Sequence, residues 1–176
     1  QGPKRMKIAG PAPTVELIRA DAAIVHARAH SHEVDVIHER AILRAGRAWI
    51  IFDRMHSSAS HDYALRLQLS PEAQGRVNML SLASGLQAAH SPELLVAVCA
   101  SHPLNIETES AWVSPQYGIR HAAPRLKLSH HASSSWVATL LLPCVGDLPD
   151  IAFDCDAKRY TLRLGSDAPI SGDWPC

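Results

Sequence analysis

Apolar and polar residues alternate with a period of two along much of this chain. In the segment 62–69, Tyr63, Leu65, Leu67 and Leu69 share one side, and small or polar residues occupy the other. Successive side chains of a β-strand point to opposite faces, so this pattern predicts a strand with one buried face. Similar runs predict strands at 14–19, 22–27, 34–43, 47–53, 76–82, 93–99, 135–142, 150–154 and 160–164.

Turn-forming residues separate these runs, since the chain contains twelve prolines and nine glycines. The segment 71–95 allows a short helix, although Gly75 and Gly85 limit its length. The segment 101–135 has few apolar runs and scattered prolines, which favour edge strands or long loops. We therefore predict an all-β fold, an antiparallel two-layer β-sandwich formed by residues 14–176 behind a loose tail of residues 1–13.

A hairpin is predicted where Ala45 and Gly46 separate the runs 34–43 and 47–53. If these two residues form the whole loop, His38 lies directly opposite Asp53, and Arg40 shares their face. If Gly46 instead forms a bulge, the pairing shifts by one residue and Asp53 moves to the other face. Alanine adopts positive φ poorly, which favours the bulge, and both registers stay open.

Charge and composition exclude some classes of function. The formal net charge is zero, and the only basic block is the short segment 4–7, so a nucleic-acid partner is not expected. No apolar run approaches the roughly 20 residues of a membrane-spanning helix. The chain has eleven histidines, whose protonation below neutral pH would suit an acidic ligand, although a histidine-rich composition without function is an equal alternative.

The four cysteines show no Cys-x-x-Cys spacing, so a zinc ribbon or a thioredoxin-like motif is not indicated. Cys99 and Cys144 lie in apolar stretches and are predicted to be buried free thiols. Cys176, at the end of the sequence, is the best candidate for a disulfide or a reactive thiol. No Gly-x-Ser-x-Gly motif of a serine hydrolase is present either.

A zinc site is one interpretation of the histidines around the hairpin, because neutral imidazoles and a carboxylate are suitable zinc ligands. The candidate ligands are His30, His32, His38, Asp53, His56 and His61, and of these we predict His38, Asp53 and His61 as the ligand set. The competing interpretation is a histidine that forms only a hydrogen bond with a carboxylate of the sheet.

Several motifs in this order resemble the carboxy-terminal β-sandwich of bacterial heparinase II/III-like polysaccharide lyases. The first group of motifs comprises His38-Glu-Arg40, Trp49-Ile-Ile-Phe-Asp53, His61-Asp-Tyr63 and Leu67-Gln-Leu-Ser-Pro71. A second region, Trp112-Val-Ser-Pro-Gln-Tyr-Gly118 followed by a strand ending at 139–143, is similar to the later part of the same module. The resemblance covers most of residues 22–143.

The resemblance implies a lyase that cleaves an acidic polysaccharide, such as a glycosaminoglycan or alginate, by β-elimination. In this family the substrate lies between the sandwich and an amino-terminal α/α-toroid, and some members hold zinc in the sandwich. The resemblance implies His38 as a catalytic residue and Arg40, Trp112 and Tyr117 as substrate-binding residues. It also implies a periplasmic or extracellular bacterial protein.

The helical half is missing from the sequence, which suggests a fragment of a longer protein, and the isolated chain is expected to have no lyase activity. The alternatives are a non-catalytic carbohydrate-binding module, in which Trp49, Trp112 or Tyr117 stacks on sugar rings, and a purely structural sandwich. Burial in the core is the simpler interpretation for Trp49, and Trp112 is the more exposed candidate.

Overall fold

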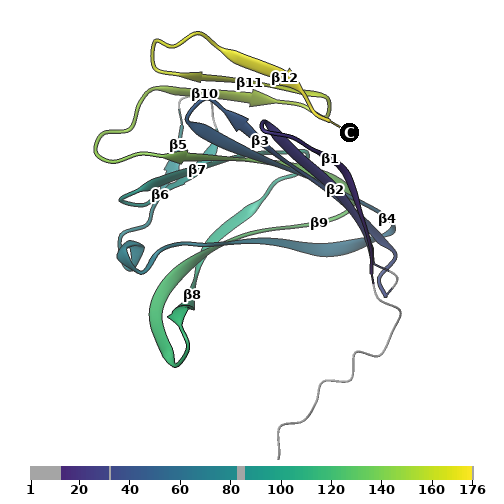
Figure 1. The fold of residues 1–176 in the computed structure, drawn as a ribbon, viewed down its shortest axis with the longest axis horizontal. Helices are drawn as coiled ribbons and strands as arrows, with labels where there is room; N and C mark the ends of the chain where they lie inside the picture. The colour runs from purple at the N-terminus through teal and green to yellow at the C-terminus, as the bar shows by residue number, and fades with distance from the viewer. Residues whose placement is uncertain (1–12, 32, 83–85, 176) are drawn as a thin grey trace, which may run out of the picture.

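The computed structural model describes residues 13–31, 33–82 and 86–175, and these form β-strands connected by short turns (Figure 1). His32, Cys176 and residues 1–12 of the predicted tail 1–13 lie outside the described residues. The described strands are β1 (Thr14–Ala20), β2 (Ile24–Ser31), β3 (Val36–Ala45), β4 (Ala48–Gln68), β5 (Asn78–Ser81), β6 (Gln87–His90), β7 (Leu94–Ala100), β8 (Asn105–Gln116), β9 (Ile119–Pro143), β10 (Ile151–Cys155), β11 (Arg159–Leu164) and β12 (Ile170–Asp173).

The strands form two antiparallel sheets, which confirms the prediction of an all-β sandwich. The large sheet has the order β1-β2-β3-β4-β9-β7-β6-β5, and β8 pairs with the first part of β9. The small sheet has the order β10-β11-β12 and lies across one face of the large sheet (Figure 1). Among the described residues, no helix is long and apolar enough to cross a membrane.

The main core lies between the two sheets. Strand alternation directs Leu43, Ile50 and Phe52 of the large sheet toward Phe153 and Trp174, and all five side chains are buried. The rings of Phe52 and Trp174 are stacked with their centroids 4.2 Å apart. This packing fixes the small sheet against the strands that carry the candidate site.

The two longest strands, β4 and β9, bend together and create a second apolar cluster. The predicted strands 47–53 and 62–69 are one continuous strand, β4, whose pairing with β9 is interrupted between His56 and His61. The lower parts of β4 and β9 turn away from the rest of the large sheet (Figure 1). Inside the bend, Met55 and Val137 lie on one side of this interruption and Leu128 lies on the other side. All three belong to the same apolar cluster.

Two other segments differ from the sequence-based expectation. In 71–95 the only helical turn described is the short 3₁₀ helix η1 (Pro71–Ala73), because the chain then continues into β5 and β6. In 101–135, β8 is an edge strand as predicted, but the remainder belongs to β9 and is not a long loop. Pro124 is tolerated in β9, where it pairs with Ser110 of β8 just beyond the last pair with β4, Gln68–Arg125.

Candidate functional site

The hairpin between β3 and β4 places His38, Arg40 and Asp53 on one face of the large sheet. Ala45 pairs with Ala48, so the loop consists of Gly46 and Arg47, and Asp53 lies opposite Arg40 rather than opposite His38. Only the first loop residue, Gly46, has a positive φ, of 60°, which is the pattern of a type II′ turn. The register thus differs by two residues from the direct His38–Asp53 pairing, and a shift of two preserves the face.

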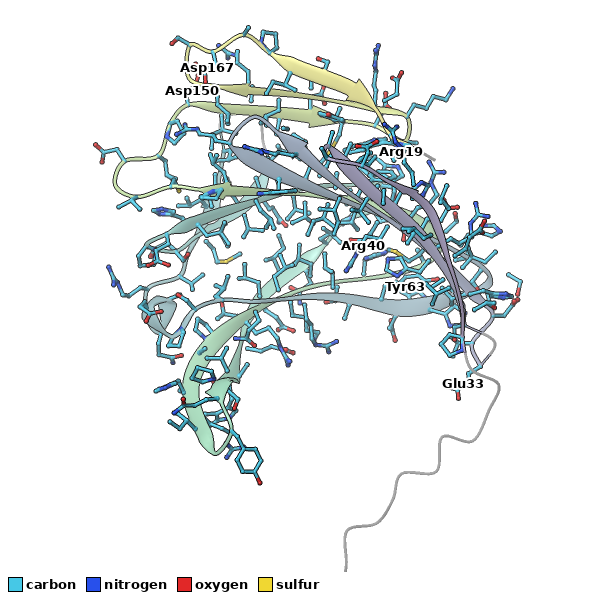
Figure 2. All side chains as sticks on the ribbon, viewed as in Figure 1. Arg19, Glu33, Arg40, Tyr63, Asp150 and Asp167 are labelled. Carbon is cyan, nitrogen blue, oxygen red and sulfur yellow. The ribbon has the colours of Figure 1, made fainter. Side chains whose placement is uncertain are left out.

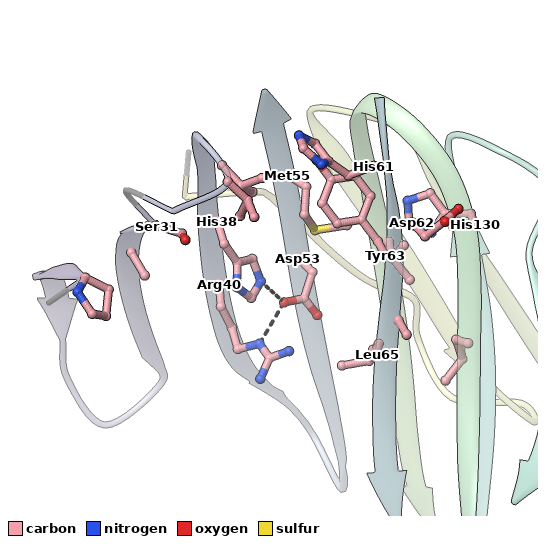
Figure 3. Close-up of a pocket in the computed structure, with 17 residues that line it drawn as sticks. Ser31, His38, Arg40, Asp53, Met55, His61, Asp62, Tyr63, Leu65 and His130 are labelled. Atoms are coloured by element: carbon pink, nitrogen blue, oxygen red, sulfur yellow. Dashed lines mark hydrogen bonds and ion pairs between the residues drawn. The ribbon is translucent and has the colours of Figure 1, made fainter. Parts of the chain in front are cut away.

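Asp53 contacts both His38 and Arg40 through one carboxylate oxygen. Its Oδ1 accepts a hydrogen bond from Arg40 Nε at 2.7 Å and lies 2.6 Å from His38 Nε2 (Figure 3). Asp53 is only 2% exposed, whereas the side chains of His38 and Arg40 are more than one third exposed. An ionised carboxylate only accepts hydrogen bonds, so His38 donates through Nε2, and Nδ1 is the nitrogen left for other partners.

These three residues line a pocket of about 490 Å³ inside the bend of the large sheet. Arg40 of β3 and Tyr63 of β4, both labelled in Figure 2, line this space. The lining residues are Pro13, Ala29, Ser31, Val34, Val36, His38, Arg40, Asp53, Met55, His61, Asp62, Tyr63, Ala64, Leu65, Leu128, His130 and Val137. The pocket therefore combines apolar walls with a small number of polar and titratable groups, as ligand sites do.

A second polar group in the pocket centres on Tyr63 and His130, whose ring centroids are 5.4 Å apart. His130 lies on β9 opposite Tyr63, and its Nε2 is 2.7 Å from Ser135 Oγ. The Tyr63 hydroxyl is buried without a hydrogen-bond partner among the described residues. Burial raises the pKa of Tyr63, and burial together with the nearby His102 lowers the pKa of His130.

The lowered pKa of His130 predicts a contribution to acid sensitivity. Because the folded protein favours the neutral ring, this contribution to stability is complete above the unfolded pKa of about 6.5 and is lost as the pH falls through the folded pKa. Urea unfolding at about pH 7 and about pH 5 should show that His130→Gln reduces the loss of stability on acidification. His131→Gln is the control, since His131 pairs with Asp62 at the surface, and an equal reduction there would contradict the prediction.

The three predicted zinc ligands are not brought together as one set. His38 and Asp53 are in contact, but His61 Nε2 is 2.9 Å from Ser57 Oγ. In the described part of the chain, no three His, Cys, Asp or Glu side chains are grouped closely enough to hold a metal ion. The donor set fits zinc poorly in this arrangement, because the positively charged Arg40 guanidinium contacts Asp53 Oδ1 beside His38, whereas His61 contacts Ser57 instead. Zinc binding by these residues stays a prediction.

The candidate substrate-binding residues are divided between two places. Arg40 lines the pocket, whereas Trp112 and Tyr117 belong to the β8–β9 hairpin and are 59% and 104% exposed. The guanidinium of Arg120 lies over the Trp112 ring, 5.1 Å from its centroid. The two aromatic residues therefore form a separate surface at this hairpin.

Comparisons with known proteins agree with the fold. Residues 8–141 match the model of a family described as Heparinase II/III-like, C-terminal. A search of curated proteins finds no significant match. The structure is similar to a crystal structure of the heparan sulfate lyase HepC from Pedobacter heparinus, with a TM-score of 0.70 and 13% identity over 92% of this chain. It is also similar to a crystal structure of heparinase III, with a TM-score of 0.68 and 12% identity over 91% of this chain.

The chain spans only part of these similar structures, namely 28% of the HepC chain and 27% of the heparinase III chain. At such low identity the likeness concerns the fold. The family match covers the strands that form the pocket and stops before the small sheet, which begins at Ile151.

Proposed function

The chain belongs to the family of heparinase II/III-like C-terminal domains, and we propose that it is the sandwich part of a lyase that cleaves an acidic, uronate-containing polysaccharide by β-elimination. In this proposal the pocket inside the bend forms one wall of the substrate cleft. A helical domain, as the family resemblance implies, supplies the opposite wall. The heparan sulfate lyase and the heparinase among the similar structures support a sulfated glycosaminoglycan as the substrate class.

The observation that carries this proposal is the contact of His38 and Arg40 with one buried carboxylate at the pocket. Asp53 accepts its hydrogen bond from Nε of Arg40. The two terminal nitrogens of the guanidinium form no hydrogen bond with another described residue. Those nitrogens have the fork geometry that binds a carboxylate or sulfate group through two hydrogen bonds. Arg40 is therefore suited to neutralise the uronate carboxylate.

His38 is suited to proton transfer during elimination. In this reaction a base removes the proton at C5 of the uronate, the electrons of that bond form the C4–C5 double bond, the C4–O bond breaks, and the leaving oxygen takes up a proton. Because Nε2 of His38 donates to Asp53, Nδ1 can accept or deliver a proton on the substrate side. Asp53 orients the ring and stabilises its charged form, as a carboxylate behind a catalytic histidine does.

Replacement of Arg40 tests the binding part of the proposal. We expect Arg40→Ala to weaken binding of the purified chain to heparan sulfate by about tenfold to a hundredfold, because a charge-assisted contact is lost. Arg44→Ala is a matched control, since Arg44 lies on the same face of β3 at the exposed end of the hairpin and bonds the Gly46 carbonyl oxygen. Titration calorimetry at two salt concentrations measures both affinities.

The outcome that would contradict a role for Arg40 is an equal loss of affinity in both variants, because the effect would then reflect net charge alone. Unfolding by urea is measured in parallel, since Asp53 is buried and keeps only His38 as a partner in Arg40→Ala. A weaker affinity in a variant that is still folded supports direct contact with the polysaccharide.

Detection of unsaturated uronate tests the reaction itself. Heparan sulfate, hyaluronan and alginate are incubated with the purified 176-residue chain and, separately, with the complete polypeptide encoded by the gene. We expect ultraviolet absorbance of the unsaturated product only with the complete polypeptide, because the base for C5 is expected on the helical part. Turnover by the 176-residue chain alone would overturn this division of roles.

A non-catalytic carbohydrate-binding function is the second candidate, and the exposure of Trp112 and Tyr117 favours it. Exposed aromatic rings present the apolar surface on which sugar rings stack. If Trp112→Ala lowers the affinity for polysaccharide and Arg40→Ala does not, binding occurs at the β8–β9 hairpin, and the pocket is not the site.

A further inference from the structure

Two thiols from different sheets meet at the edge of the main core. Cys99 lies on β7 of the large sheet, Cys155 is the last residue of β10 in the small sheet, and both are partly exposed free cysteines. The Cys99 thiol donates a hydrogen bond to the Cys155 carbonyl oxygen, with 3.4 Å between Sγ and O. Both side chains pack against the main core from its edge.

We propose that Cys99 and Cys155 form a disulfide bond that joins the two sheets when the protein meets a disulfide oxidant such as glutathione disulfide. This inference is independent of the proposed lyase function, because neither cysteine lines the pocket. Strands β7 and β10 are already in contact, and the Cys99 sulfur lies 3.4 Å from the backbone of Cys155, so the bond would join neighbouring segments of the fold. The two residues are 56 positions apart, and the bond would close a long loop that contains β8 and β9.

The surroundings assign the two cysteines different roles in the exchange. Hydrogen bonding from the Cys155 thiol lowers the pKa of Cys99, whereas the same contact, burial and the nearby Asp154 and Asp156 raise the pKa of Cys155. The Cys99 thiolate therefore attacks glutathione disulfide, forms a mixed disulfide and releases one glutathione thiolate. Cys155 then loses its proton to solvent and attacks the Cys99 sulfur, which forms the internal bond and releases the second glutathione.

Cys144 is also a free thiol, but Cys144 has no hydrogen bond to another cysteine among the described residues. The exchange is therefore expected to select Cys99 and Cys155.

The bond would fix the small sheet next to the strand that carries Asp53. Directly after Cys155, the Asp156 carbonyl oxygen accepts a hydrogen bond from Trp174 Nε1 at 2.7 Å, and the Ala157 carbonyl oxygen accepts one from Arg54 at 3.1 Å. Arg54 is the neighbour of Asp53 on β4. Oxidation would thus anchor β10 at the point where the small sheet contacts β4.

Thiol counting and peptide mapping of the purified chain test the proposal. After incubation with glutathione disulfide we expect the loss of two thiols, a decrease of about 2 Da in mass and one peptide pair that joins Cys99 to Cys155. The melting temperature should rise by about 5 to 10 °C and return to its starting value with dithiothreitol. The mapping needs no variant, so its result does not depend on whether a substitution impairs folding.

Variants separate this pair from the other cysteines. We expect Cys144→Ser to form the bond as the wild type does, and Cys99→Ser and Cys155→Ser to lose both the bond and the rise in melting temperature. A bond that joins Cys144 or Cys176 to another residue would overturn the proposal. Glutathione adducts that persist on Cys99 without internal closure would overturn it as well.

Discussion

Replacement of His38 by alanine is expected to lower the turnover of heparan sulfate by about 10²- to 10⁴-fold in the complete polypeptide if His38 transfers a proton in the transition state, as proposed above. His38 contacts the buried Asp53 and lines the pocket, so its ring is both oriented and accessible. The effect should fall mainly on kcat, with a smaller change in KM, since Arg40 remains available to bind the substrate. Initial rates of unsaturated uronate formation measure both quantities.

His56→Ala is the matched control for this prediction. His56 is an exposed histidine of β4 on the opposite face of the sheet, where it pairs with Ile37. Its removal should leave kcat within about twofold, as expected of a surface substitution away from the site. An unchanged kcat in His38→Ala would show that His38 does not transfer a proton in the reaction. The pocket would then have at most a binding role.

Phe52→Ala is expected to destabilise the fold by about 3 to 5 kcal/mol, the range measured for large aromatic residues removed from well-packed cores. Phe52 is 1% exposed, stacks on Trp174 at 4.2 Å and lies 6.1 Å from the Trp136 ring centroid. Loss of the Phe52 ring opens a cavity between the two sheets, next to Asp53 in the sequence. Urea denaturation followed by circular dichroism measures the free energy of unfolding.

Trp49→Ala serves as the comparison for Phe52, because Trp49 belongs to the same strand but is 44% exposed on the other face. We expect this variant to lose less than about 1.5 kcal/mol, since much of the indole surface is already in contact with water. If both variants lost the same stability, the contact between the sheets would contribute less than its burial indicates.

Alternation of apolar and polar residues was sufficient to predict most of the strands, because each strand of a sandwich buries one face. The continuity of β4 was not predictable, since the segment 57–62 is polar and has the composition of a loop. In the structure this segment carries the interruption in the pairing with β9, where Ser57 Oγ contacts His61 Nε2. Trp49 illustrates the opposite error, because an aromatic residue in an apolar run was interpreted as core and is partly exposed.

The face shared by His38, Arg40 and Asp53 was one of two predicted alternatives, and the structure has this face with a different register. Placing Gly46 first in the loop moves the pairing by two residues, which composition alone does not reveal. His130 reaches the pocket because it pairs with Tyr63, which lies 67 positions earlier in the chain. Such long-range pairing is set by packing of the whole sheet and leaves no local signal.

At the bend β4 contains more residues than β9, and the pocket lies inside this bend. Between the pairs His56–Ser134 and His61–Ala132, β4 has four intervening residues and β9 has one. An insertion or deletion at 57–60 is therefore expected to change the angle between the two parts of the large sheet, and with it the width of the pocket, while the pairs on either side keep their register. Under the proposed function, the size of the bound ligand could change in this way without a substitution in either apolar core.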